Sequence, residues 1–198
     1  MGKFKVITIS RQYGSGGHII GENLAKRLEV PFYDKLLIDM IANESGMSTG
    51  YISDTENIET SSKIFNFAAM GYCPANTECT NNVTEDVFNA QSEIIQRVAK
   101  EPCIIVGRCA DYILQDREDV LRIFIKASYE DRKNRAINDY NVDENEVSKI
   151  IKKSDKARAK YYAYYCEGDW GDANNYHLAI DSGIGIDKAV NIILEAIK

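Results

Sequence analysis

Short apolar runs alternate with longer amphipathic stretches along this chain. Two of the runs, at residues 102–108 and 120–126, carry almost no polar alternation, which is the pattern of parallel strands covered on both faces of a sheet. The first run, residues 6–9, is rich in β-branched side chains, which favour strands. Two further short strands are predicted at residues 32–34 and 176–181.

The stretches between the strands repeat their apolar residues every three or four positions, as amphipathic helices do. Helices are predicted through residues 19–28 and 36–41, at about 62–70 and 84–100, in one short turn after residue 108, and from Asp187 onward. Residues 45–61 contain turn residues and little periodicity and are predicted to be a loop. Strands that alternate with helices in this way predict an α/β fold with a mostly parallel sheet.

Four charged residues stand at or just after the predicted strand ends. They are Arg11, Asp34, Arg108 and Asp181. The carboxyl ends of parallel strands meet at one edge of the sheet, and ligands of open α/β folds bind outside that edge. We therefore expect these four side chains to lie together on the ligand side.

A glycine-rich segment joins the first predicted strand to the first predicted helix. Strand, glycine turn and helix N-terminus in this order are the layout of a phosphate-binding loop, whose usual motif is G-x-x-x-x-G-K-[ST]. The lysine is missing, because Gly17 stands at its position, His18 at the position of the hydroxyl, and Arg11 at that of the first glycine. The dinucleotide fingerprint G-x-G-x-x-G is not met from Gly14 or Gly16, which disfavours a Rossmann cofactor site.

A purely structural use of these glycines is the alternative. A glycine-rich turn also lets a helix pack closely on a sheet, and Gly21, one turn into the predicted helix, fits that use. The segment alone does not decide between the two, and residues elsewhere in the chain must.

Residues 129–165 form a long, highly charged and helical stretch between the fourth and fifth predicted strands. Arg132 and Arg135 lie three positions apart, and Asp155 and Arg158 repeat that spacing, so each pair shares one helix face. Such an arm can swing over a bound anion. A solvated helix face with ion pairs three positions apart has the same pattern.

Composition narrows the classes of function. With 198 residues, 44% hydrophobic and 27% charged residues and three prolines, the chain is expected to fold as one domain, residues 1–198, with inserted lobes. A net charge of −6 and a pI of about 5.1 argue against a nucleic-acid binder, which normally has a strongly basic face. A small anionic ligand stays open, because it needs only a local cluster of arginines and amides.

Cysteine usage and the N-terminal residues bear on the compartment. The five cysteines are an odd set without a C-x-x-C pair, and only two histidines are present, so neither a disulfide framework nor a zinc site is predicted. Reduced, mostly buried thiols are expected. The sequence contains neither a recognisable signal peptide nor a membrane span, so we expect a cytoplasmic protein that binds no membrane.

Four segments resemble the cytidylate-kinase-like family of P-loop proteins. They are residues 9–21 (ISRQYGSGGHIIG), 32–35 (FYDK), 105–114 (IVGRCADYIL) and 155–158 (DKAR), the last followed by Tyr161 and Tyr162. The resemblance spans nearly the full length and keeps the order of the motifs. It implies the three-layer α/β fold of P-loop kinases, in which helices cover both faces of a five-stranded, mostly parallel sheet. It also implies an acceptor-binding lobe at about residues 34–100 and a helical lid arm at about 129–165.

The resemblance also implies a reaction, which is phosphoryl transfer from ATP with Mg²⁺, between small nucleotide substrates. The acceptor it favours is a pyrimidine nucleoside monophosphate such as CMP or dCMP. A kinase of another small metabolite is the alternative, because residues 34–100 do not obviously reproduce a base-reading pocket. A nucleotide- or anion-binding sensor that has lost catalysis is a third interpretation, motivated by the absent lysine.

Roles for individual residues follow from the resemblance. The donor phosphates are assigned to Gly14, Ser15, Gly16, Gly17 and His18. The acceptor is assigned to Asp34, Lys35 and Arg108. The catalytic cations are Arg11, Arg132, Arg135 and Arg158, with Asp155 holding the geometry of Arg158 in the lid.

The missing lysine leaves one role unfilled. A cation that acts on the transferring group is worth about 10³- to 10⁵-fold in rate. We expect Arg11, or alternatively Lys35, to deliver this charge from a different starting point. The imidazole of His18 is a poor ligand for a hard cation, so the metal is expected to be held through water or the nucleotide alone.

Aromatic side chains gather near the end of the predicted arm. They are Tyr161, Tyr162, Tyr164, Tyr165 and Trp170. Either a homodimer interface or packing beneath the arm accounts for them, and the sequence leaves both open.

Overall fold

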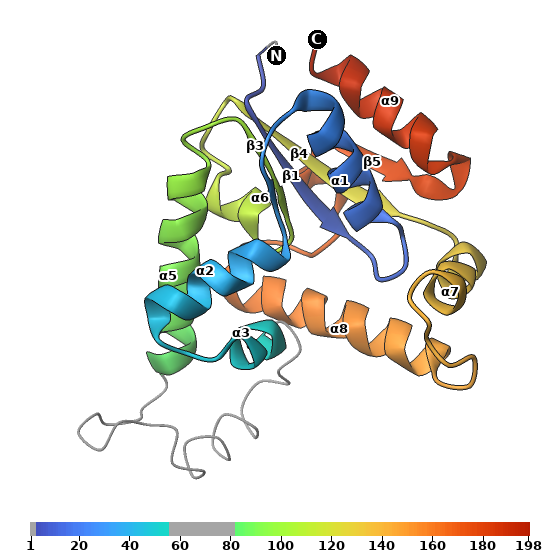
Figure 1. The fold of residues 1–198 in the computed structure, drawn as a ribbon, viewed down its shortest axis with the longest axis horizontal. Helices are drawn as coiled ribbons and strands as arrows, with labels where there is room; N and C mark the ends of the chain where they lie inside the picture. The colour runs from blue at the N-terminus through green and yellow to red at the C-terminus, as the bar shows by residue number, and fades with distance from the viewer. Residues whose placement is uncertain (1–2, 56–81) are drawn as a thin grey trace.

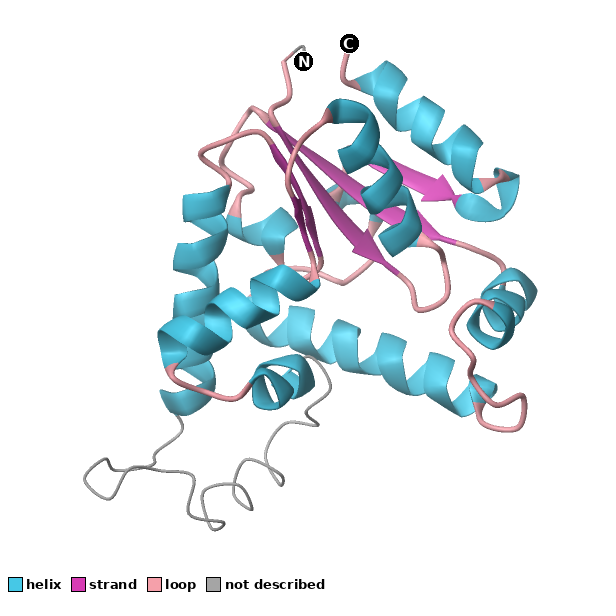
Figure 2. Cartoon of the chain, in the orientation of Figure 1, coloured by secondary structure: helices cyan, strands magenta, loops and turns pink. Residues whose placement is uncertain are grey.

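The computed structural model describes residues 3–55 and 82–198 (Figure 1). The helix predicted at about residues 62–70 lies outside the described residues. The elements in the described part alternate between strands and helices from β1 to α9, as the hydrophobic pattern predicts (Figure 2).

Five parallel strands form the central sheet. They are β1 (Val6–Arg11), β2 (Phe32–Tyr33), β3 (Cys103–Val106), β4 (Val120–Lys126) and β5 (Leu178–Asp181), in the spatial order β2-β3-β1-β4-β5. All four neighbouring pairs are parallel, with Ile9 opposite Val106 and Arg11 opposite Ile125. The predicted α/β fold with a five-stranded parallel sheet is confirmed, and β1 lies at its centre.

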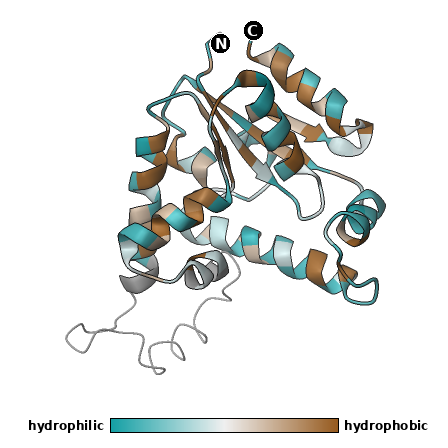
Figure 3. Cartoon of the chain, in the orientation of Figure 1, coloured by the Kyte–Doolittle hydropathy of each residue, from teal (hydrophilic) through white to brown (hydrophobic). Residues whose placement is uncertain are grey.

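Helices cover both faces of this sheet. Ile7 and Ile9 of β1 pack with α1 (Gly17–Leu28) and α9 (Ile186–Ala196) on one face. The other face carries α2 (Lys35–Ser45), α5 (Asn82–Val98) and α6 (Ala110–Ile113), which share a second core with Val6 and Ile105. Hydrophobic residues, coloured brown, make up much of the strands and alternate with hydrophilic ones along the helices (Figure 3). None of the described helices is both long and apolar enough to cross a membrane.

The prediction of a loop at residues 45–61 was wrong for part of that range. Helix α3 (Thr49–Thr55) lies inside it. This helix of 7 residues contributes Ile52, which is fully buried, to the core beneath α2. A helix this short produces no readable hydrophobic period, so the pattern could not reveal it.

The charged stretch at residues 129–165, which we call the arm, consists of two helices. They are α7 (Tyr129–Asn138) and α8 (Val147–Tyr165). Helix α8 runs across the edge of the sheet where the parallel strands end (Figure 1). This placement brings the arm to the ligand side of the fold.

Candidate active site

The glycine loop, residues 12–16, connects β1 to α1 at the centre of the sheet. Gly14 and Gly16 have φ values of 75° and 79°, a left-handed conformation that glycine adopts without steric cost. Gly16 caps α1 without any side-chain hydrogen bond, and no acidic residue occupies the first turn. The first amides of α1 therefore face outward with the positive end of the helix dipole, which is the arrangement that binds phosphate.

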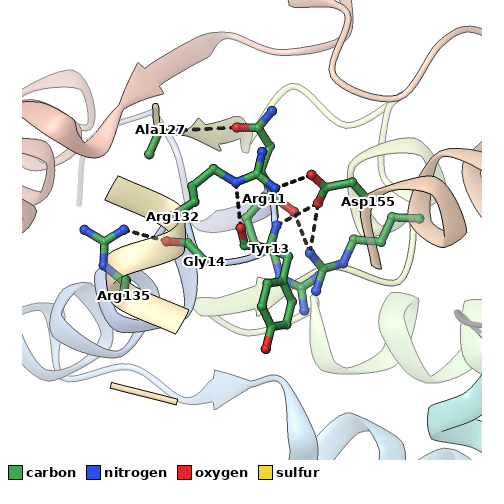
Figure 4. Close-up of polar contacts among 9 residues, drawn as sticks. Arg11, Tyr13, Gly14, Ala127, Arg132, Arg135 and Asp155 are labelled. Carbon is green, nitrogen blue, oxygen red and sulfur yellow. Dashed lines mark hydrogen bonds and ion pairs between the residues drawn. The ribbon is translucent and has the colours of Figure 1, made fainter. Parts of the chain in front are cut away.

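The arm holds the backbone of the glycine loop (Figure 4). The Nε of Arg132 donates to the Tyr13 carbonyl oxygen at 2.7 Å, and the Asp155 carboxylate accepts from the Tyr13 amide at 2.8 Å. Arg132 and Asp155 also form an ion pair with each other, and the Arg132 side chain is 8% exposed. Arg135 donates to the Gly14 carbonyl oxygen at 2.6 Å. Three residues of the arm thus set the orientation of three consecutive peptide groups of the loop.

Helix α7 approaches the loop so closely that residue 14 must lack a side chain. A Cβ atom at Gly14 would lie 2.6 Å from the carbonyl oxygen of Arg132. From the other side of the loop, Ser182 donates from its hydroxyl to the Ser15 carbonyl oxygen at 2.5 Å. Sequence reasoning did not find Ser182, because a serine after a strand has many uses and no local signal ties it to residue 15.

Arg158 lies at the junction of the arm with β1. It donates to the carbonyl oxygen of Arg11 at 3.2 Å, and its Nη1 is 3.9 Å from the Asp155 carboxylate. Its guanidinium is 6.0 Å from the centre of the Tyr13 ring. The predicted pair of Asp155 and Arg158 is therefore adjacent in the fold, beside the glycine loop.

Arg11, the last residue of β1, extends along the carboxyl edge of the sheet. Its Nη2 atom lies 3.8 Å from the carboxylate of Asp34, which follows β2, and its side chain is 15% exposed. Asp34 in turn is 2.6 Å from Nδ1 of His18 in the first turn of α1. One carboxylate thus links a cation from β1 to an imidazole from α1. Lys35, next to Asp34, is exposed and has no ion-pair partner among the described residues.

Arg108 follows β3 in an unusual turn. Gly107, Arg108 and Cys109 have consecutive φ values of 76°, 58° and 53°. For the two residues with side chains, this conformation costs about 1–3 kcal/mol each and is concentrated at functional sites. Arg108 is nonetheless buried, with 5% of its surface exposed.

A fully buried glutamine supports this turn. Gln91 of α5 donates to the carbonyl oxygen of Arg108 at 2.9 Å and accepts from the hydroxyl of Tyr161 at 3.2 Å. The three residues come from α5, the turn after β3 and α8. Sequence reasoning missed Gln91, because one polar residue in an amphipathic helix gives no sign that it points inward.

A pocket opens between the ends of β1 and β3 and the helix α8. Three arginines, three aromatic residues and three smaller residues line it. The arginines are Arg11, Arg108 and Arg158, the aromatic residues are Tyr161, Tyr162 and Trp170, and the smaller residues include Ser10. The three guanidinium groups favour an anionic ligand, and the rings offer flat apolar walls. Of the residues predicted from the sequence, the structure brings Arg11, Arg108 and Arg158 to one pocket.

Asp181 ends β5 at the same edge of the sheet, but its side chain stabilises the turn that follows β5. Its carboxylate accepts from the Gly183 amide at 2.9 Å, and it lines no part of the pocket. The expectation that it joins the other three charged residues was therefore wrong in detail. Strand β5 is the edge strand beyond β4, so its end lies two strands away from β1.

A buried carboxyl group lies beneath the pocket. Asp111 of α6 is 2% exposed, and one of its oxygens accepts from the Ser10 hydroxyl at 3.3 Å. Its other oxygen is buried and makes no hydrogen bond of normal geometry among the described residues. Burial raises the pKa of the Asp111 carboxyl, and the hydrogen bond from Ser10 opposes this rise only in part. Burial and the nearby carboxyl also raise the pKa values of Tyr162 and Tyr176.

The aromatic residues at the end of the arm are mostly packed inside. Tyr161, Tyr162, Tyr165 and Trp170 surround the buried thiols of Cys109 and Cys166. Phe88 stacks on Tyr165 with ring centres 4.1 Å apart. Tyr164 is 55% exposed. Packing beneath the arm thus accounts for most of this group.

Comparisons with known proteins identify a family and several solved structures that are similar to this chain. A model of the cytidylate kinase-like family matches residues 6–184. A solved structure of an uncharacterized protein from Eubacterium ventriosum ATCC 27560 is 28% identical, covers 97% of each chain and has a TM-score of 0.72. No curated protein sequence matches the chain.

Two kinases share the fold at lower identity. Shikimate kinase from Bacteroides thetaiotaomicron is 15% identical over 96% of each chain, with a TM-score of 0.54. A gluconokinase from Sinorhizobium meliloti 1021 is 14% identical over 96% of this chain and 90% of its own, with a TM-score of 0.53. At these identities the likeness concerns the arrangement of strands and helices.

Proposed function

The chain belongs to the cytidylate kinase-like family, and from this premise we propose that it transfers a phosphoryl group from ATP to a small anionic acceptor. The observation that carries the proposal is the pocket in which Arg11, Arg108 and Arg158 meet beside the glycine loop. Three cations in one pocket, next to an uncapped helix N-terminus, suit a reaction between two negatively charged molecules.

In phosphoryl transfer the protein itself takes part in little covalent chemistry. Catalysis comes from holding donor and acceptor in line and from stabilising charge on the oxygens of the transferring group. In the proposed arrangement the amides from Gly14 to His18 bind the donor phosphates, and Arg108 and Arg158 bind the acceptor from the opposite side. Asp34 orients the acceptor at the end of β2.

The second proposed role of the arm is to hold the loop in a binding conformation. Arg132 and Arg135 already donate to the carbonyl oxygens of Tyr13 and Gly14. In a trans peptide group the amide points opposite to the carbonyl, so the Gly14 amide points away from the arm. The Ser15 amide donates to the Gln12 carbonyl oxygen at 3.2 Å and closes the turn of the loop. A preorganised loop of this kind costs no reorganisation when phosphate binds.

We propose Mg²⁺ as the metal that accompanies ATP. Asp155 contacts the loop at Tyr13 and Asp34 contacts His18 at the start of α1, and both carboxylates are paired with cationic or imidazole side chains. His18 offers nitrogen, which Mg²⁺ binds poorly. This donor set fits a metal that is held mainly by phosphate oxygens and water, where it would neutralise charge between the donor phosphates.

For the acceptor we propose a pyrimidine nucleoside monophosphate, with CMP or dCMP as the first candidate. The family supports it, and the rings of Tyr161, Tyr162 and Trp170 offer surfaces on which a base can stack. The second candidate is another small anionic metabolite, because shikimate kinase and gluconokinase share this fold. The three buried cysteines among the described residues support a reducing, cytoplasmic setting for either reaction.

A panel assay tests the proposal. The purified chain is incubated with ATP and Mg²⁺ and with one candidate acceptor at a time, from nucleoside monophosphates to hydroxy acids and sugar acids, and ADP formation is followed. We expect acceptor-dependent ADP formation with one chemical class. Binding of ATP without ADP formation across the whole panel would instead identify a nucleotide sensor.

A further inference from the structure

We propose that Arg11 is the catalytic cation of this site and delivers from the end of β1 the charge that a P-loop lysine delivers from the start of the helix. Gly17 and Gly107 are the two positions that make room for it. The inference rests on the proposed phosphoryl transfer and adds to it the residue that acts on the transferring group.

Gly17 stands where the lysine of the usual motif is expected, and the structure gives a reason for its replacement. A Cβ atom at residue 17 would lie 2.6 Å from Cβ and 3.0 Å from Cγ of Arg11. Contacts between carbon atoms at these distances are strongly repulsive. The stem of Arg11 and a side chain at residue 17 therefore exclude each other, so the chain can carry one cation or the other.

Gly107 makes room for the other end of the same side chain. A Cβ atom built at Gly107 would collide with the Nη1 atom of Arg11. Gly107 is also the first residue of the left-handed turn, with a φ of 76°. Two glycines from separate elements thus border one arginine, one at its stem and one at its guanidinium.

The guanidinium lies between the two halves of the proposed site. On one side Arg11 is 3.8 Å from Asp34, whose other oxygen contacts His18 at the start of α1. On the other side it lines the pocket together with Arg108 and Arg158. Arg11 is therefore placed to contact a group that passes from the start of α1 to this pocket.

Asp34 gives Arg11 a counter-charge without using all of its donors. A guanidinium has five N–H groups arranged in a planar fork, so it can contact a carboxylate and a phosphoryl group together. The separation of 3.8 Å between Arg11 and Asp34 is that of an ion pair and exceeds the usual range for a hydrogen bond. The fork of Arg11 therefore keeps donors for an anion.

In the proposed transfer, the bond between the γ-phosphorus and the bridging oxygen of ATP breaks, and its electron pair stays on ADP. A lone pair of the acceptor oxygen forms the new bond to phosphorus, and an acceptor proton, where there is one, passes to water. Arg11 neither bonds to phosphorus nor transfers a proton. It stabilises negative charge on the oxygens of the phosphoryl group during the transfer.

The test moves the cation back to the position of the lysine. Four proteins are compared with the parent chain: Arg11→Ala, Gly17→Lys, the double variant Arg11→Gly with Gly17→Lys, and the control Lys126→Ala. Lys126 is an exposed lysine that ends β4, next to β1, and it lines no part of the pocket. The measurements are ATP affinity in the presence of Mg²⁺ by calorimetry, ADP formation with the best acceptor of the panel, and the thermal unfolding midpoint.

Arg11→Ala is expected to lower kcat by about 10²- to 10³-fold, as the loss of one preorganised donor does. Its ATP affinity is expected to fall less than about tenfold, because an interaction made mainly in the transition state affects kcat more than binding. Lys126→Ala is expected to match the parent in both measurements. Equal kcat in Arg11→Ala and the parent would overturn the inference.

The double variant gives a second and independent readout. Gly17→Lys alone is expected to lower Tm by about 2–10 °C, since it overpacks the stem of Arg11. With Arg11→Gly the space is free, so the double variant should regain most of that Tm and at least tenfold in kcat over Arg11→Ala. A double variant that is no more stable than Gly17→Lys and no more active than Arg11→Ala would contradict mutual exclusion.

The outcomes separate this inference from the proposed function. If the parent chain binds ATP without forming ADP, the proposed reaction is wrong, and the affinity for ATP then tests Arg11. Weaker ATP binding by Arg11→Ala would support a contact between Arg11 and a phosphate. Unchanged binding would overturn that contact. A parent chain that does not bind ATP overturns both. An active parent with an equally active Arg11→Ala protein overturns the inference alone.

Discussion

The carboxylate of Asp155 accepts a hydrogen bond from the backbone amide of Tyr13, 142 positions earlier in the chain, at a distance of 2.8 Å. The same carboxylate pairs with Arg132 and lies beside Arg158. One acidic residue of α8 therefore fixes the glycine loop and two arginines of the arm relative to one another.

We expect Asp155→Asn to destabilise the fold by about 2–4 kcal/mol, because it leaves the buried guanidinium of Arg132 without its charge partner. The amide can still accept from Tyr13, so the loss reports the charge. Chemical denaturation measures it. The exposed pair of Lys149 and Glu146 is the matched control, and Glu146→Gln should change stability by less than about 0.5 kcal/mol. Similar losses in the two variants would show that the arm does not depend on the Asp155 charge.

The contacts of Gln91 predict a separate effect, on the binding of the acceptor. Replacement by leucine removes the hydrogen bond to the carbonyl oxygen of Arg108 and the one from the hydroxyl of Tyr161. The loss of these bonds in a buried site costs about 1–3 kcal/mol. The turn that carries Arg108 is expected to relax, so the KM for the acceptor should rise at least tenfold while the affinity for ATP stays within about twofold. Steady-state kinetics and calorimetry measure the two quantities.

Ser92→Ala is the control for Gln91→Leu. Ser92 is the next residue of α5 and donates only to the Phe88 carbonyl oxygen within the same helix. Its removal should leave the acceptor KM unchanged. A rise in KM of equal size in both proteins would mean that α5 as a whole, rather than the support of the turn, determines acceptor binding.

The sheet could be predicted from the sequence because each strand has a local signature. Residues 120–126 form a mostly apolar run with Arg122 as its one internal polar residue, and β4 has these same bounds. The arm was readable as a charged helical stretch for the same reason. The contacts of the arm could not be predicted, because the hydrogen bond from Arg132 to the Tyr13 carbonyl oxygen spans 119 positions and depends on how α7 docks on the loop.

Three features of the site left no readable sequence signal. Gln91 and Ser182 are common polar residues whose role is set by what faces them in the fold. The exclusion between Arg11 and residue 17 depends on where two Cβ atoms lie, which no spacing rule contains. The sequence shows that a glycine replaces the expected lysine at residue 17. The steric reason for this replacement appears only in the three-dimensional structure.

Gly21 predicts how tightly α1 packs on the sheet. A Cβ atom at this position would lie 2.9 Å from Phe32 and 3.2 Å from both Ile9 and Val106. We expect Gly21→Ala to lower the free energy of unfolding by about 1–3 kcal/mol through overpacking, despite the higher helix propensity of alanine. Gly50 in α3 has no neighbour within 4 Å of an added Cβ atom, so Gly50→Ala should be neutral or stabilising by up to about 1 kcal/mol. Thermal or chemical unfolding of both variants provides the comparison, and a stabilised Gly21→Ala protein would refute close packing of α1.

The buried carboxyl of Asp111 predicts a pH dependence with a defined sign. Burial raises its pKa in the folded state, so between the unfolded value of about 4 and the raised folded value the native protein binds more protons than the unfolded chain. Its contribution to stability must therefore fall as pH rises through that window. Asp111→Asn removes the titration, and its stability relative to the parent should increase from pH 4 to pH 7 in denaturation experiments. For Asp119 the expected pH dependence of stability has the opposite sign, because the Arg117 guanidinium lowers the pKa of its carboxyl. The loss of stability in Asp119→Asn relative to the parent should therefore grow as pH rises through the acidic range in which the parent carboxylate ionises. Parallel profiles for Asp111→Asn and the parent would mean that Asp111 titrates in the folded protein as it does in the unfolded chain.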